Sequence, residues 1–169
     1  MSEEEPVRSA LGRPPRAYTT GAVTTWLGRA ALLLTLAISA TLLASYSRLP
    51  ETIPTHFNLA GQADGWGPRS SIFVLVGICT VLTVGIVLLS RHPQIFNYPF
   101  EITGGNAQAV YREGERMLIW AACAISLLYL STGLGTLFGF NPSPMITVAM
   151  AGLLGATGVG IVRIVQAAR

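Results

Sequence analysis

The chain has 169 residues, of which 51% are hydrophobic and only 11% are charged, whereas about a quarter of the residues in a typical soluble domain are charged. This composition excludes an ordinary soluble fold and predicts that much of the apolar surface faces lipid. The net charge of +3 does not indicate a nucleic-acid-binding protein, because the arginines are spread among segment ends rather than gathered in one run.

The first 25 residues contain three glutamates in succession, three prolines and few apolar side chains. Such a segment cannot bury enough apolar surface to offset the entropy of ordering it. We therefore expect residues 1–25 to form a disordered leader and residues 26–169 to form a single membrane domain.

Four apolar stretches follow the leader, and each is close to the roughly 20 residues that a helix needs to cross a bilayer. They cover residues 27–46, 71–90, 117–138 and 145–165. The sequence therefore predicts an all-α protein, a bundle of four transmembrane helices. The first stretch could instead be a signal peptide, with Ser45 and Ser47 before the cleavage point, but its long polar leader and long apolar core favour a retained anchor.

The arginines also predict the orientation of the bundle, since basic residues concentrate in cytoplasmic loops. Two lie between the first and second spans, namely Arg48 and Arg69. The other nine lie on the opposite side of the bundle and are Arg8, Arg13, Arg16, Arg29, Arg91, Arg112, Arg116, Arg163 and Arg169. We expect a multi-pass plasma-membrane protein with both termini and the 91–116 loop in the cytoplasm, and with the 47–70 loop outside.

Small residues predict where helices approach one another, because lipid supplies no hydrophobic drive for helix association. Gly152, Ala156 and Gly160 recur every four residues along the fourth span, and packing within the bundle is favoured over a homodimer. Several hydroxyl groups within the spans are expected to form hydrogen bonds locally or between helices. These are Thr35, Ser39, Thr80, Thr83, Ser126, Tyr129 and Thr157.

The outer loop contains the stretch LPETIPTHFNLAGQADGWGPR, residues 49–69. Its prolines favour an extended chain, its glycines allow positive φ, and Asp64-Gly65 is a common turn dipeptide. We expect a short hairpin, with residues 55–58 in one arm and residues 63–66 in the other.

The polar and aromatic groups of this loop form the candidate recognition site. Its residues are Pro54, His56, Phe57, Asn58, Gly61, Asp64 and Trp66. They could bind a peptide or a lipid headgroup, or they could be structural, with Trp66 as an interfacial anchor and His56 as a hydrogen-bonded loop residue. One histidine and one aspartate are too few for a zinc site, and no catalytic motif is present. We therefore expect neither an enzyme nor a cofactor.

The cytoplasmic loop carries a second candidate surface. From about Asn106 a helix is expected to continue without a break into the third span, which places Gln108, Tyr111, Arg112 and Glu115 on one face. This face could dock a cytoplasmic regulator or could simply be solvated.

The outer loop also resembles a known family. Eleven positions match the pattern LPxxIPxHFNxxGxxDxWG of the SdpI-type bacterial membrane proteins, a domain of unknown function, and they run from Leu49 to Gly67. The best-known member protects its producer against a secreted peptide toxin and tethers a cytoplasmic repressor. The resemblance implies a role in immunity or signalling for this chain.

Two functional hypotheses follow. The first is a non-enzymatic membrane protein that recognises an extracellular peptide or lipid through residues 49–69. The alternative is an accessory subunit of a larger membrane transporter or membrane enzyme, packed through its small-residue faces.

Overall fold

The computed structural model describes residues 12–58 and 62–169, and it is mostly helical. Four long helices run along the bundle: α1 (Ala22–Ala44), α2 (Ser71–Ser90), α3 (Ala107–Phe138) and α4 (Ser143–Ala167). Each is long and apolar enough to cross a membrane, which confirms the four predicted spans and supports a multi-pass membrane protein. The range of α2 equals the predicted one, and α3 begins near Asn106, as its sequence suggested.

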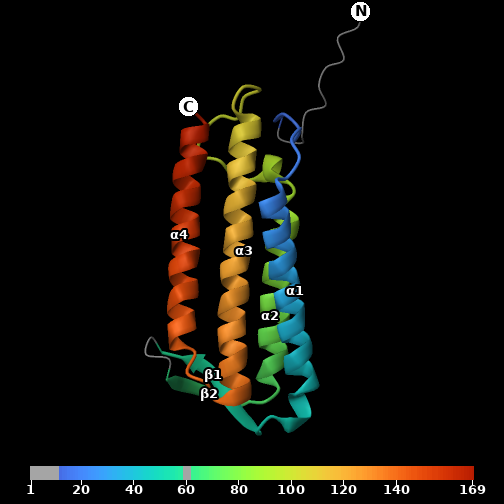
Figure 1. Ribbon diagram of the computed structural model, residues 1–169, viewed down its shortest axis with the longest axis vertical. Helices are drawn as coiled ribbons and strands as arrows, with labels where there is room; N and C mark the ends of the chain where they lie inside the picture. The colour runs from blue at the N-terminus through green and yellow to red at the C-terminus, as the bar shows by residue number, and fades with distance from the viewer. Residues whose placement is uncertain (1–11, 59–61) are drawn as a thin grey trace, which may run out of the picture.

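Helix α3 is the centre of the bundle, since the other three helices all pack against it. Figure 1 shows α4 on one side of α3, with α1 and α2 on the other. The small two-stranded sheet lies at one end of the bundle, which we call the hairpin end. The start of α1 and the end of α4 lie at the opposite end, which we call the strap end.

The leader differs from its expected disorder wherever the structure describes it. Residues 13–20, which we call the strap, lie against the start of α3 and the loop before it, and residues 22–25 belong to α1. The arginines and backbone carbonyls of the strap find hydrogen-bond partners there, so ordering does not depend on apolar burial alone. Residues 1–11 lie outside the described part of the chain.

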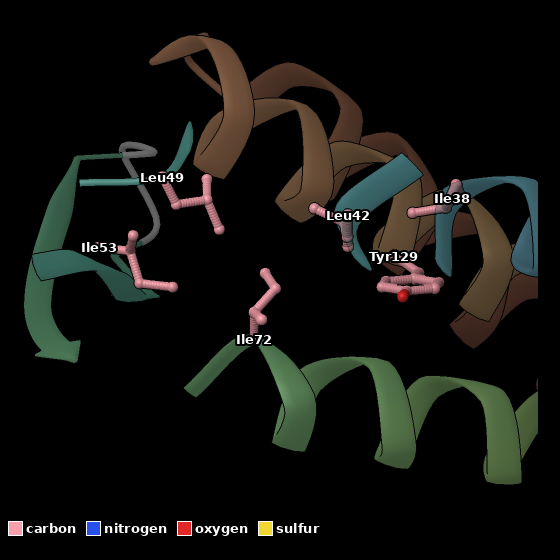
Figure 2. Close-up of a cluster of buried hydrophobic side chains, with 6 residues drawn as sticks. All are labelled: Ile38, Leu42, Leu49, Ile53, Ile72 and Tyr129. Carbon is pink, nitrogen blue, oxygen red and sulfur yellow. The ribbon is translucent and has the colours of Figure 1, made fainter. Parts of the chain in front are cut away.

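The hairpin end has a compact apolar core. Six buried side chains come from α1, the segment leading into the hairpin, the hairpin itself, α2 and α3. Figure 2 shows how they converge: Ile38, Leu42, Leu49, Ile53, Ile72 and Tyr129. The hairpin is therefore docked on the bundle through Ile53 and Leu49 and is not a free loop.

Hydroxyl groups join the helices in the middle of the bundle. Thr35 of α1 lies 3.1 Å from Ser126 of α3, oxygen to oxygen, and donates to Thr83 of α2 at 3.4 Å. Ser39 is similarly placed 3.0 Å from Thr80 and 3.1 Å from Tyr129. These bonds satisfy polar groups that would otherwise be costly in lipid, as the sequence predicted.

Small residues permit close approach at fewer positions than their spacing suggested. At Gly160 an added Cβ would lie 2.3 Å from Cγ of Met117 on α3, whereas at Gly152 it would meet nothing within 4 Å. Ala156 is half-buried. Glycines of α3 make further close contacts, since a Cβ at Gly133 would lie 3.2 Å from Ile38. The repeat on α4 did not reveal that α3 is the central helix.

Candidate functional site

The hairpin consists of β1 (Thr52–Phe57) and β2 (Ala63–Pro68), paired antiparallel. Its register places Pro54 opposite Trp66 and His56 opposite Gly65. The turn is closed by Asn58, whose backbone N–H donates to the Gln62 carbonyl at 2.9 Å and whose side-chain oxygen accepts from the Gln62 N–H at 3.0 Å. The strands are those the sequence predicted, slightly longer. Gly61 lies outside the described residues.

Two expectations about this loop need correction. Asp64-Gly65 is part of β2 and not the turn, and neither Gly65 nor Gly67 has a positive φ. These glycines are required for steric reasons: a Cβ at Gly65 would lie 2.9 Å from His56 Cβ, and one at Gly67 would lie 2.9 Å from Thr55 Cγ2. The side chains of β1 therefore lie directly over β2, which brings the two strands close together.

Three of the candidate recognition residues have exposed side chains. Nδ1 of His56 lies 2.5 Å from Oδ1 of Asp64, with the two side chains 71% and 45% exposed. Trp66 follows on the same strand face as Asp64 and is 62% exposed. An imidazole, a carboxylate and an indole are thus presented together at the surface, where they could bind a polar or aromatic group.

Phe57 has a different position, half-buried against the bundle. Its ring lies so close to Gly135 of α3 that a Cβ there would be 3.2 Å from Cζ, and the same Cβ would lie 3.4 Å from Pro142. Phe57 therefore holds the far end of β1 on the α3–α4 connection. Asn58 closes the turn, so these two predicted residues have clear structural roles.

A cavity of about 710 Å³ lies beneath β1. It is bounded by the hairpin, α2, α3 and the start of α4, and sequence reasoning did not anticipate it. Most of its lining is apolar, including Ile53, Phe57, Leu75, Ile78, Leu128 and Ile146. Among the described residues that line it, His56 is the only ionisable one. The space suits a hydrophobic group better than a charged one.

The second candidate surface, at the start of α3, is covered by the strap. The Gln108 side chain accepts from the Ala17 N–H at 2.8 Å and donates to the Pro15 carbonyl at 2.9 Å. The Tyr111 hydroxyl donates to the Pro14 carbonyl at 3.1 Å. The polar groups expected to meet water or a partner are thus used within the chain.

Glu115 completes this contact and is only 3% exposed. Its carboxylate accepts from Thr20 Oγ1 at 2.6 Å and pairs with Arg16 Nη2 at 3.2 Å. Arg112 lies over the Tyr18 ring, 5.0 Å from its centroid. The four residues predicted on one face are brought together, but the strap lies over them, and no local pattern predicted that contact.

The strap also holds the loop before α3. Arg13 donates to the Phe96 carbonyl at 2.6 Å and to the Gln94 carbonyl at 3.2 Å, and it lies over the Tyr98 ring. Burial raises the pKa of the Tyr98 hydroxyl well above its usual value. The strap, this loop and α3 therefore form one packed unit.

A family model described as a domain of unknown function, DUF1648, matches residues 30–80, which include most of α1, the hairpin and the first half of α2. An uncharacterised protein of Archaeoglobus fulgidus is 36% identical over 84 residues, covering 43% of this chain and 46% of that protein. The chain thus spans about half the length of this relative. No solved structure matches the chain. The family match therefore covers the part of the chain that builds the hairpin, together with most of α1 and the first half of α2.

Proposed function

We propose that the protein is a non-enzymatic membrane receptor that binds an extracytoplasmic peptide or lipid through the hairpin. The observation that carries this proposal is the apolar cavity beneath β1, with His56 in its lining and Asp64 paired with His56. A hydrophobic chain would enter the cavity, while His56, Asp64 and Trp66 would contact the polar part of the same molecule. This arrangement is typical of sites in which apolar contacts supply affinity and a few polar groups fix orientation.

The proposal includes an orientation and a role. Eight of the arginines that the structure describes lie toward the strap end and two toward the hairpin end, which supports a cytoplasmic strap end and an external hairpin. The SdpI-type resemblance supports immunity against a secreted peptide, or signalling of its presence, as the role of this binding.

Photo-crosslinking from inside the cavity tests the proposal. A benzophenone amino acid at Ile78 would face the cavity, and the same residue at Leu88 provides the control, because the two positions on α2 are 55% and 51% exposed. In native membranes we expect Ile78 to capture a discrete peptide or lipid and Leu88 to capture bulk lipid. Substituting His56 or Asp64 by alanine should reduce capture at Ile78 alone. Identical adducts at both positions, insensitive to these substitutions, would refute the proposal.

An accessory-subunit role is the second candidate. It is supported by glycines that face no other part of the described chain, since an added Cβ at Gly77, Gly85 or Gly152 would meet nothing within 4 Å. Such positions allow another membrane helix to approach closely. Purification in a mild detergent should then recover a stoichiometric membrane partner, whereas a lone monomer or homodimer would count against this role.

A further inference from the structure

A second cavity, of about 300 Å³, lies at the strap end between α1, α2 and α3. Three arginines from separate segments line it: Arg16 of the strap, Arg29 of α1, and Arg91 directly after α2. Hydroxyl-bearing residues line it as well, namely Thr20, Thr24, Thr25 and Ser90. Positively charged and hydroxyl-bearing residues therefore line the same cavity.

The positive charge of this cavity is not fully compensated. Glu115 is the acidic residue in the lining, and its carboxylate is already bound by Arg16 and Thr20. Neither Arg29 nor Arg91 forms an ion pair with a carboxylate of residues 12–58 or 62–169. Three arginines against one glutamate leave an excess of positive charge in the lining.

The Arg16 guanidinium also has one hydrogen-bond donor that binds no group of the described chain. Its Nε is buried and has no hydrogen-bond partner within the described chain, although its Nη atoms bind Glu115 and the Arg91 carbonyl. A buried donor without a partner is destabilising. An anion within the cavity that reached this nitrogen would remove that destabilisation.

We propose that this cavity binds a phosphate group. Guanidinium groups match phosphate oxygens with paired, charge-assisted hydrogen bonds, whereas the hydroxyls of Thr20, Thr25 and Ser90 already donate within the chain. The base of the cavity is apolar, with Leu32, Val87 and Ile119, and Trp26 lies exposed beside Arg29, with the guanidinium 4.9 Å from its ring centroid. This mixture fits the headgroup of an anionic phospholipid at the membrane surface, and free phosphate shares the same chemistry. The site is separate from the hairpin and does not depend on its function.

Native mass spectrometry of the full chain in detergent tests the site. The probes are phosphatidylglycerol, phosphatidylcholine of equal chain length, and inorganic phosphate. We expect wild-type protein to retain phosphatidylglycerol at least about tenfold better than phosphatidylcholine, and the Arg29→Gln/Arg91→Gln variant to lose most of this preference. Arg163→Gln is the matched control: it removes the same charge at the same end, outside the cavity, and should retain the preference.

Two further measurements identify the source of the phosphate and distinguish loss of binding from loss of the fold. Displacement of phosphatidylglycerol by millimolar phosphate would identify the free anion as a ligand, and resistance to it would identify the lipid. The Arg29→Lys/Arg91→Lys variant keeps the charge but lacks the planar donors, so its preference should fall between wild type and the glutamine variant. Equal binding of the two lipids by wild type, or an equal loss in Arg163→Gln, would overturn the proposal.

Discussion

At each end of the bundle a short segment packs against α3, but the two segments are held by different kinds of interaction. At the hairpin end, β1 docks through apolar side chains, while the side chains of His56 and its partner Asp64 remain exposed. At the strap end, residues 13–20 dock through hydrogen bonds and an ion pair. Docking of β1 through apolar side chains leaves an apolar cavity and exposed polar residues at the hairpin end. Docking of the strap, in contrast, occupies the polar side chains of α3 with hydrogen bonds within the chain.

This difference separates the residues that hold the fold from those available to a ligand. At the hairpin end, Ile53 and Phe57 hold the structure while His56, Asp64 and Trp66 remain free to bind. At the strap end the docking residues themselves are the polar ones, so a partner for Gln108, Tyr111 and Glu115 would first have to displace the strap. Substitutions at the two ends should therefore have distinct effects.

The largest effect is expected where α4 meets α3 near the strap end. A valine at Gly160 would place Cβ within 2.7 Å of Met117 Cβ, which the backbone cannot accommodate without moving. Gly160→Val should lower the free energy of unfolding by about 3 kcal/mol, measured by denaturant titration in micelles. Gly152→Val adds the same atoms in open space and should change it by less than about 0.5 kcal/mol. Equal losses in both variants would contradict the close α3–α4 contact.

The next effect tests apolar closure at the hairpin end. Ile53 is buried to 3% exposure among Leu49, Ile72 and their neighbours, so Ile53→Ala should destabilise docking of the hairpin by about 2–3 kcal/mol. Proteolysis of the 58–62 turn should become faster in native membranes. The exposed neighbouring residue gives the control, since Thr52→Ala should leave the cleavage rate unchanged. If both variants are cleaved like wild type, the hairpin is held by something other than this cluster.

A smaller effect is expected for polar closure at the strap end. Glu115→Gln keeps the shape of the side chain but removes its charge beside Arg16 and Thr20, so strap docking should weaken by about 1–2 kcal/mol. Hydrogen exchange at Ala17 N–H, which donates to Gln108, should become faster.

Glu113→Gln is the control for this variant, because Glu113 pairs instead with Arg116 and Arg163. It should leave exchange in the strap unchanged. Equal acceleration in both variants would show that general charge, and not the Glu115 contact, holds the strap.

The sequence predicted what depends on local pattern. Apolar runs defined the helices, and the prolines, the glycines and the Asp64-Gly65 dipeptide indicated the hairpin. It could not predict what depends on distant pairing: the cavity under β1 needs α2, α3 and α4 together, and the strap contact joins residues about 90 positions apart. Local pattern predicted positive φ as the reason for the glycines of β2. The actual reason is steric, because Thr55 and His56 on the opposite strand leave no room for a Cβ.

The smallest effect on stability is expected for substitution of His56, and this substitution also tests most directly whether the two ends of the bundle differ. Its pair with Asp64 is largely exposed, and exposed ion pairs contribute about 0.2–1 kcal/mol at most. His56→Ala should therefore leave the free energy of unfolding almost unchanged while reducing ligand capture at Ile78. A loss well above 1 kcal/mol would instead make His56 a structural residue of the hairpin. The exposed polar residues of the hairpin would then help to hold the hairpin on the bundle, as the polar residues of the strap do at the other end, and the two ends would no longer differ.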